Sequence, residues 1–578
     1  MQESESASLR PDGAPPPLRS GRDSGVRERS AWPWWALLVI ALVVGVFLRC
    51  YQLRTQMLID DEWHAVRMLI RADAAGIAGH FGLADYCIPL TLYYRWLYDL
   101  GALSEWQMHL PLLIAGIALL VVAPRLLRDT IALPTRALWV GLLAISPTLV
   151  YFSRTARPYA LIAVLGMVAI VAFRNWHLRR GDRRVWATLY VITTFTAGWL
   201  HLLSLTFTLW PFVYYGIGAL RECRRYPTRA AALRSLGAMI VLGCVVSSAL
   251  AVALARPLLN DWRVMSGKAG ADSVTPWSLY RTLLMQFGIA DVWLCALLFA
   301  LLAFGVWRLW RRDRDFVALT LSATVVGIVV ICAARAAWIQ HAPVLVRYST
   351  PILPFLLLYV AEGAVGLLER VRMPVLAVAL AALSLGGLFR AGPMPGWFYA
   401  PNQFMGHAIF QFDYDPRENP YATLLQLGPV SPFYLELAKR PPHSVTVIET
   451  PERAQSNFMP DPWLQKIHRQ NVKFALASPV CGVGEWDEYP YTATGARFRR
   501  IGKLADVLNG ATYGANYLVL RLHPWTLPPG KDFPWPVAWP EMTACAAKVT
   551  AKLGAPTYRD DQIVVFALSG KSGSSTSR

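Results

Sequence analysis

Long apolar segments recur along the first 390 residues and restrict the fold more than any other feature of the chain. Hydropathy defines about eleven of them, each close to the roughly 20 residues that cross a bilayer as a helix. Their approximate limits are 33–53, 106–127, 135–152, 158–176, 185–200, 202–220, 235–256, 289–309, 316–337, 349–368 and 373–390. Only 16% of residues are charged and 55% are hydrophobic, which excludes an ordinary large soluble enzyme. The sequence therefore predicts a polytopic α-helical membrane protein.

Arginines between these segments predict the orientation. If the N-terminus is cytoplasmic, every arginine-rich loop also lies in the cytoplasm, as the positive-inside rule requires. These loops contain Arg125 and Arg128; Arg179, Arg180, Arg183 and Arg184; Arg221, Arg224 and Arg225; Arg308, Arg311, Arg312 and Arg314; and Arg370 and Arg372. They also explain much of the net charge of +19 without a nucleic-acid partner. We expect a multi-pass protein of the inner (plasma) membrane with its C-terminal region in the periplasm.

Composition divides the chain into four parts. Residues 1–31 are rich in Ser, Pro and Arg and predict a disordered cytoplasmic tail, and 570–578 predict a second one. Residues 32–390 form the transmembrane domain. Residues 391–569 contain β-branched runs separated by helical stretches, which predicts an extracytoplasmic α/β domain with a largely parallel sheet. The expected strands are 444–449, 472–478, 517–522 and 562–568, and the expected helices lie around 462–470, 502–508 and 541–553.

Two of the eight cysteines, Cys481 and Cys545, lie in this C-terminal region. They can form a disulfide if the region faces an oxidising compartment. Five others lie in or beside apolar segments and are expected to be packing residues, namely Cys50, Cys223, Cys244, Cys295 and Cys332.

Four polar features converge on the predicted outer face. They are Asp60-Asp61-Glu62 after the first span, Ser153–Tyr159 (SRTARPY) at a later turn, His201 between two spans, and Arg347-Tyr348 before a span with two prolines. Charged residues beside a span are costly unless they pair or face water, so such residues mark functional sites. Aromatic, helically spaced segments at 63–78, 89–100 and 277–286 predict helices lying in the membrane interface at the same face.

The order of these motifs resembles the GT-C membrane glycosyltransferases. Within them it is most similar to the branch that contains the protein O-mannosyltransferases, the aminoarabinose transferases of lipid A and the RgtA/B/C/D-like enzymes. The resemblance covers about residues 33–390, and SRTARPYAL is its most specific part. It implies a GT-C-like fold and transfer of a hexose or pentose from a polyprenyl-phosphate donor. The acceptor would be a hydroxyl of an envelope glycolipid, polysaccharide or protein.

The resemblance also implies residue roles. Asp61 would be the general base and Glu62 its supporting carboxylate, with Asp60 as the alternative base. Arg347 and Tyr348 would bind the donor phosphate, whose developing charge needs cationic partners. Further residues of the site would be Arg154 or Arg157 near the phosphate, together with His201 and Tyr159.

Each assignment has a structural alternative. Arg154 and Arg157 can snorkel at a span end, His201 can pack at the interface, and Arg347-Tyr348 can anchor it. The chain also departs from branches that place an acid soon after the second motif's arginine, because Pro158 and Tyr159 stand there. This departure favours metal-independent chemistry, although it leaves a divalent metal open. A polyprenyl-lipid flippase or an inactive envelope scaffold would share the polytopic architecture.

Overall fold

The computed structural model describes residues 31–397 except for 52, 57, 59, 60, 226, 227, 271, 290, 338 and 341. It also describes 430–451, 461–477, 480–481, 501–523 and 542–568. Asp60 and nearly all of the two predicted tails therefore lie outside the described residues.

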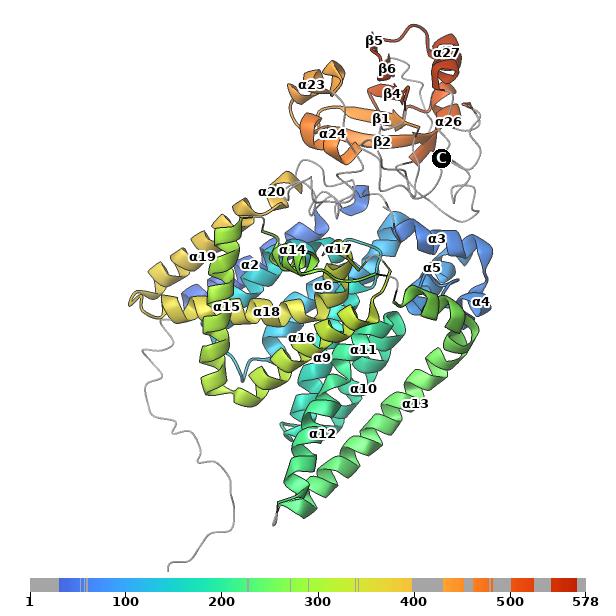
Figure 1. Cartoon of the computed structure of the whole chain (residues 1–578). Helices are drawn as coiled ribbons and strands as arrows, with labels where there is room; N and C mark the ends of the chain where they lie inside the picture. The colour runs from blue at the N-terminus through green and yellow to red at the C-terminus, as the bar shows by residue number, and fades with distance from the viewer. Residues whose placement is uncertain are drawn as a thin grey trace, which may run out of the picture.

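Each predicted apolar segment forms helix (Figure 1). The helices are α2 (Trp32–Cys50), α6 (Glu105–Leu126), α7 (Leu133–Ile145), α9 (Tyr159–His177), α10 (Arg183–Leu200), η2 (Leu202–Ser204) with α11 (Leu205–Thr208) and α12 (Trp210–Cys223), α13 (Arg229–Lys268), α15 (Val292–Arg312), α16 (Arg314–Ala334), α18 (Leu353–Leu368) and α19 (Pro374–Ala391). Within the described part of the chain, nine helical segments are long and apolar enough to cross a membrane. They include all of these helices except α7 and α10. The prediction of a polytopic helical membrane protein is confirmed.

The predicted span 135–152 is divided in two at Ser146-Pro147. Pro147 is the first residue of a short helix, α8 (Pro147–Phe152), a position where its missing N–H costs nothing. The Ser146 hydroxyl accepts the N–H of Leu149 at 3.4 Å and caps this second helix. The break ends α7 after 13 residues and leads the chain into the SRTARPY turn.

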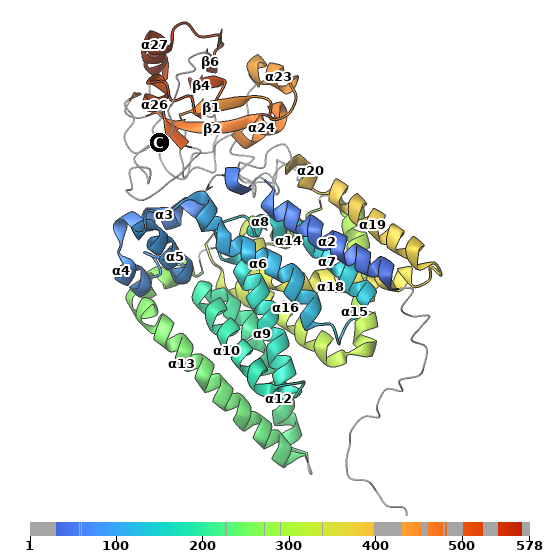
Figure 2. The same ribbon diagram turned by 180° about the vertical axis from the view of Figure 1, so that it is seen from behind.

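Helix α13 continues well beyond its predicted end near residue 256. Its 40 residues would extend about 60 Å at the α-helical rise. The helix bends at Asp261, whose carboxylate lies 2.9 Å from His80 Nδ1 and accepts the N–H of Gly82 at 2.9 Å. Both views show the C-terminal end of α13 beside α4 (Ala74–Gly79) (Figures 1 and 2). The extension therefore packs on the loop between α2 and α6.

Short helices gather at the end of the bundle that carries the polar motifs. They are α3 (Asp61–Arg71), α4, α5 (Ile88–Asp99), α14 (Pro276–Phe287), α17 (Ala342–Ser349) and α20 (Met394–Trp397). The predicted helix 63–78 is two helices, because the Asp73 carboxylate accepts the N–H of Gly76 at 2.8 Å and starts α4. The predicted helices 89–100 and 277–286 correspond to α5 and α14.

The C-terminal region forms a six-stranded sheet in the order β3-β2-β1-β4-β6-β5. Strands β1 (Thr446–Thr450), β2 (Asn471–Leu476), β3 (Ile501–Lys503) and β4 (Tyr517–Arg521) are parallel. Strand β6 (Ile563–Ala567) is antiparallel to both β4 and β5 (Tyr558–Arg559). Helices α23 (Pro432–Ala438) and α24 (Asp461–His468) pack on one face, and α26 (Leu504–Leu508) and α27 (Met542–Leu553) on the other. The predicted α/β domain is thus observed, with an antiparallel edge that the sequence analysis did not anticipate.

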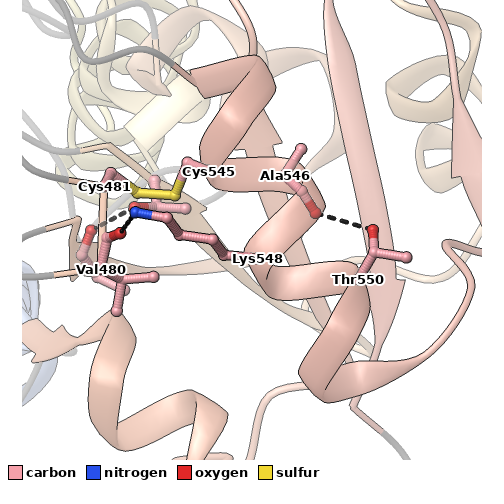
Figure 3. Close-up of a disulfide and its surroundings, with 8 residues drawn as sticks. Val480, Cys481, Cys545, Ala546, Lys548 and Thr550 are labelled. Atoms are coloured by element: carbon pink, nitrogen blue, oxygen red, sulfur yellow. Dashed lines mark hydrogen bonds between the residues drawn. A yellow bond between two sulfur atoms is a disulfide. The ribbon is translucent and has the colours of Figure 1, made fainter.

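Cys481 and Cys545 form a disulfide in this domain, with their Cα atoms 4.9 Å apart (Figure 3). The bond joins the segment after β2 to α27, where Lys548 Nζ also donates to the carbonyl of Val480 at 3.1 Å. Tyr151 of α8 packs both on the core of the helical bundle and on the core of the sheet domain. The sheet domain therefore covers the end of the bundle that carries the polar motifs.

Candidate active site

Glu62, in the first turn of α3, is fully buried against the SRTARPY turn. Its Oε1 lies 2.9 Å from Nε2 of the buried His109 in α6 and accepts the backbone N–H of Ala156. The Tyr94 hydroxyl of α5 donates to the carbonyl of Ala156 at 3.0 Å. A buried carboxylate needs such partners, because an unpaired charge in this environment is costly. Glu62 therefore attaches helix α3 to the turn that carries Arg154 and Arg157.

Arg154 is an anchor at the end of α2. Its side chain is fully buried, and Nη1 donates to the carbonyls of Leu48, Arg49 and Tyr51 at 3.3, 3.0 and 2.6 Å. Nε donates to Gln56 Oε1 at 3.1 Å, and Gln56 Nε2 returns a bond to the Arg154 carbonyl at 2.7 Å. These contacts satisfy carbonyls that the end of a helix leaves without intrahelical partners. Arg154 therefore has an anchoring role at the end of α2.

Arg49 fixes the same turn from inside α2. Its guanidinium donates to Ser153 Oγ at 3.2 Å and to the carbonyl of Leu143 in α7 at 3.0 Å. Helix α6 approaches this junction at Gly116, where an added Cβ would lie 1.9 Å from Ser153 Oγ. Any larger residue at position 116 would displace the turn. The turn is thus set by α2, α6 and α7 together.

Arg157 instead contacts the loop between α4 and α5. Its Nη1 forms an ion pair with Oδ2 of Asp85, and both side chains are largely buried, at 14% and 10% exposed. Asp85 Oδ1 also lies 3.9 Å from Nδ1 of His64 in α3. Two arginines only three residues apart therefore have different surroundings.

A row of aromatic side chains and arginines lies beside Arg157. The ring centroids of Tyr159 and His201 are 6.0 Å apart, and those of His201 and Tyr348 are 5.2 Å apart. The Arg347 guanidinium lies 5.2 Å from the centroid of the Tyr348 ring. Gln286 of α14 donates to the carbonyl of Val346 at 3.2 Å and to Ser349 Oγ at 2.6 Å. Helix α14 thus holds α17, which carries Arg347, in place.

His201 is a neutral imidazole in this row. Burial and the positive charges of Arg347 and Arg157 lower its pKa to about 3. At neutral pH it therefore adds no charge and retains one ring nitrogen that accepts hydrogen bonds and one that donates. Among the described residues, none hydrogen bonds to its buried Nδ1.

The proposed base, Asp61, is the first residue of α3 and directly precedes Glu62. Asp60 lies outside the described residues. Within the described ranges, no group of three or more His, Cys, Asp and Glu side chains could hold a metal ion. Glu62 instead pairs with His109, and Asp85 with Arg157.

Two important residues were missed by the sequence analysis. His109 lies in the first turns of a predicted span, and a polar residue in such a segment is a detectable signal for an internal partner. Asp85 lies in a short loop between α4 and α5, and no local pattern distinguishes it from a solvated acid. Only its contact with Arg157 reveals it.

No family model matches the sequence, and no curated protein matches it either. Among solved structures, the aminoarabinose transferase ArnT from Cupriavidus metallidurans matches 93% of this chain and 98% of its own. Its apo and undecaprenyl phosphate-bound forms align with a TM-score of 0.43 at 12% and 13% identity. The oligosaccharyltransferase AglB from Archaeoglobus fulgidus, in complex with an inhibitory peptide and a dolichol-phosphate, aligns with a TM-score of 0.39 at 13% identity. That match covers 86% of this chain and 70% of AglB. Likenesses of this size assign neither an activity nor a substrate to this chain.

Proposed function

We propose that this protein is a GT-C-type membrane glycosyltransferase that transfers a sugar from a polyprenyl phosphate to a hydroxyl of an envelope glycan, lipid or protein. One observation carries the proposal. His201 and the arginines and tyrosines around it come from three segments that are distant in sequence. Helix α3 is bonded through Glu62 to the turn that carries Arg157. Carboxylates and arginines at one end of a bundle are what transfer from a lipid phosphate requires.

In the proposed reaction, the acceptor hydroxyl attacks C1 of the sugar while its proton passes to the Asp61 carboxylate. The bond between C1 and the phosphate oxygen breaks, and its electron pair remains on the phosphate. Arg347 and Arg157 stabilise that charge, because charge-assisted hydrogen bonds strengthen as the charge develops. His201, as a neutral group, offers its Nδ1 to the sugar or the phosphate. Glu62 supports Asp61 by fixing helix α3, and Arg154 supports Arg157 by fixing the turn.

The proposal can be tested in the cell. A deletion strain should lack one sugar on an envelope glycolipid, polysaccharide or glycoprotein, and the wild-type gene should restore it. The Asp61→Asn gene should be expressed in the membrane at the normal level without restoring the sugar. An unchanged envelope glycan profile in the deletion strain would contradict the proposal.

Arg347→Ala should weaken binding of the donor by about 1.5–3 kcal/mol, the range for hydrogen bonds to charged groups. Arg347→Lys should recover part of this loss, since an ammonium lacks the planar fork of a guanidinium. The measurement is the affinity of the purified protein for polyprenyl phosphate. Arg335→Ala, which removes an exposed arginine at the end of α16, is the matched control and should bind normally. Normal affinity in Arg347→Ala would remove Arg347 from the phosphate site.

The proposed orientation places the sheet domain in the periplasm together with the active site. The disulfide sulfurs lie on buried residues, so an exposed position gives a clearer label. In a background without the six unpaired cysteines, Lys552→Cys on α27 should react with an impermeant maleimide on intact spheroplasts. Arg180→Cys, in an expected cytoplasmic loop, should react only after lysis. The reverse result would invert the orientation.

A flippase is the main alternative function. The position of the buried charges at the end of the bundle away from the polar motifs distinguishes it from a transferase. Arg174 of α9 is buried there, with its Nη2 2.6 Å from Asp313 and its Nε 3.0 Å from Asp315. This network joins the end of α9 to the turn between α15 and α16. A transport path would instead be expected to place charged residues near the bilayer midplane. A flippase would move the lipid-linked sugar without releasing polyprenyl phosphate, and an inactive scaffold would do neither.

A further inference from the structure

Asp85 occupies an unusual backbone position in the first outer loop. Its φ is +47°, and that of the following Tyr86 is +60°. Residues other than glycine seldom adopt positive φ, and the strained conformation persists only where the surrounding structure imposes it. The Asp85 side chain is only 10% exposed. The loop therefore holds a carboxylate in a fixed place at a conformational cost.

The contacts of Asp85 join two parts of the candidate site. Oδ2 of Asp85 pairs with Nη1 of Arg157, and Oδ1 lies 3.9 Å from Nδ1 of His64 on helix α3. The charge of Arg157 in turn reaches His201 and contributes to its lowered pKa. Asp85 is thus the acidic neighbour of one of the two arginines whose charges act on His201.

We propose that Asp85 is a positioning residue that holds the Arg157 guanidinium for the donor phosphate, in place of the acid that is missing after Arg157 in the sequence. The inference rests on the proposed function and deepens it. A guanidinium has five N–H donors in a rigid plane, so fixing one end of it determines where the others point. Asp85 does not itself bind the phosphate, because two anions would repel each other.

The charge of Asp85 leads to a specific kinetic expectation. Asp85→Asn removes a negative charge beside the Arg157 guanidinium, so attraction for the donor phosphate should be unchanged or stronger. The guanidinium would, however, lose its defined orientation in the transition state. We therefore expect kcat to fall by about 10–100-fold, while the KM for the donor stays the same or decreases. Asp85→Glu should restore part of kcat, since it restores the charge.

The test uses the purified full-length protein with a polyprenyl-phosphate sugar as the donor. The variants are Asp85→Asn, Asp85→Glu, Arg157→Ala, and Arg157→Ala combined with Asp85→Asn. If Asp85 acts through Arg157, the double variant should be no slower than Arg157→Ala alone. The matched control is Asp99→Asn on α5, because Asp99 also pairs with an arginine, Arg95, at 2.6 Å but is half exposed. That control should retain normal kcat and KM.

Binding of radiolabelled polyprenyl phosphate to each variant gives a readout that does not depend on turnover. The inference predicts that folded Asp85→Asn binds this lipid at least as well as wild type. A normal kcat in Asp85→Asn, a raised KM with normal kcat, or additive losses in the double variant would overturn it while leaving the proposed function standing. Wild-type protein that transfers no sugar would overturn both.

Discussion

Asp61→Asn should reduce sugar transfer by about 10²–10⁴-fold, the usual contribution of a general base, while expression and thermal stability stay close to wild type. Amide nitrogen cannot accept the proton of the acceptor hydroxyl, so attack on the sugar would have no base. The effect on folding should be small, because a carboxylate in the first turn of a helix contributes only about 0.3–1 kcal/mol. Turnover by the purified variant, measured beside its thermal unfolding, checks both parts.

Two neighbouring substitutions sharpen this result. Asp60→Asn should retain most activity, and the opposite pattern would move the base by one residue. Glu62→Gln should lower thermal stability, because Glu62 is buried between His109 and the N–H of Ala156. A stable Glu62→Gln variant with no activity would instead place Glu62 in direct contact with the reacting groups.

Arg154→Gln should prevent the accumulation of folded protein in the membrane. The substitution removes the donors for three carbonyls at the end of α2 and for the side chain of Gln56. Each buried acceptor left without a partner costs about 1–3 kcal/mol, so the sum is a large share of the stability of a typical protein. The yield of monodisperse protein in detergent and its unfolding temperature are the measurements.

Arg157→Gln provides the comparison, since Arg157 lies three residues further along the same turn. It should give folded protein that transfers sugar poorly. Folded Arg154→Gln with weakened affinity for polyprenyl phosphate would return Arg154 to the phosphate site and contradict the anchoring role.

The sequence was sufficient to predict the helical bundle and the sheet domain, because both depend on local patterns. A membrane span requires a run of apolar residues whatever its neighbours are, and short β-branched runs between helices indicate a parallel sheet. The extension of α13 was not predictable in this way. The residues after 256 are polar enough to suggest a loop, and they become helical against His80 and Gly82, which lie about 180 residues earlier.

The candidate site was only partly accessible from sequence for a similar reason. Motif order indicates which segments contribute, but it does not say which way each side chain points. Arg154 and Arg157 look alike in the sequence, whereas the structure directs one to the end of α2 and the other to Asp85. Asp85 and His109 take part through contacts across the fold, and a single sequence does not identify the partner in such a contact.

Sugar transfer by the purified protein tests the central claim most directly. Full-length protein in lipid nanodiscs would be given a panel of radiolabelled polyprenyl-phosphate sugars and an envelope extract from the deletion strain as the acceptor. The account predicts that label passes from one donor to the extract with release of an equal amount of polyprenyl phosphate, and that Asp61→Asn abolishes both. Intact donor after incubation with every sugar in the panel, by folded protein that still binds polyprenyl phosphate, would contradict it.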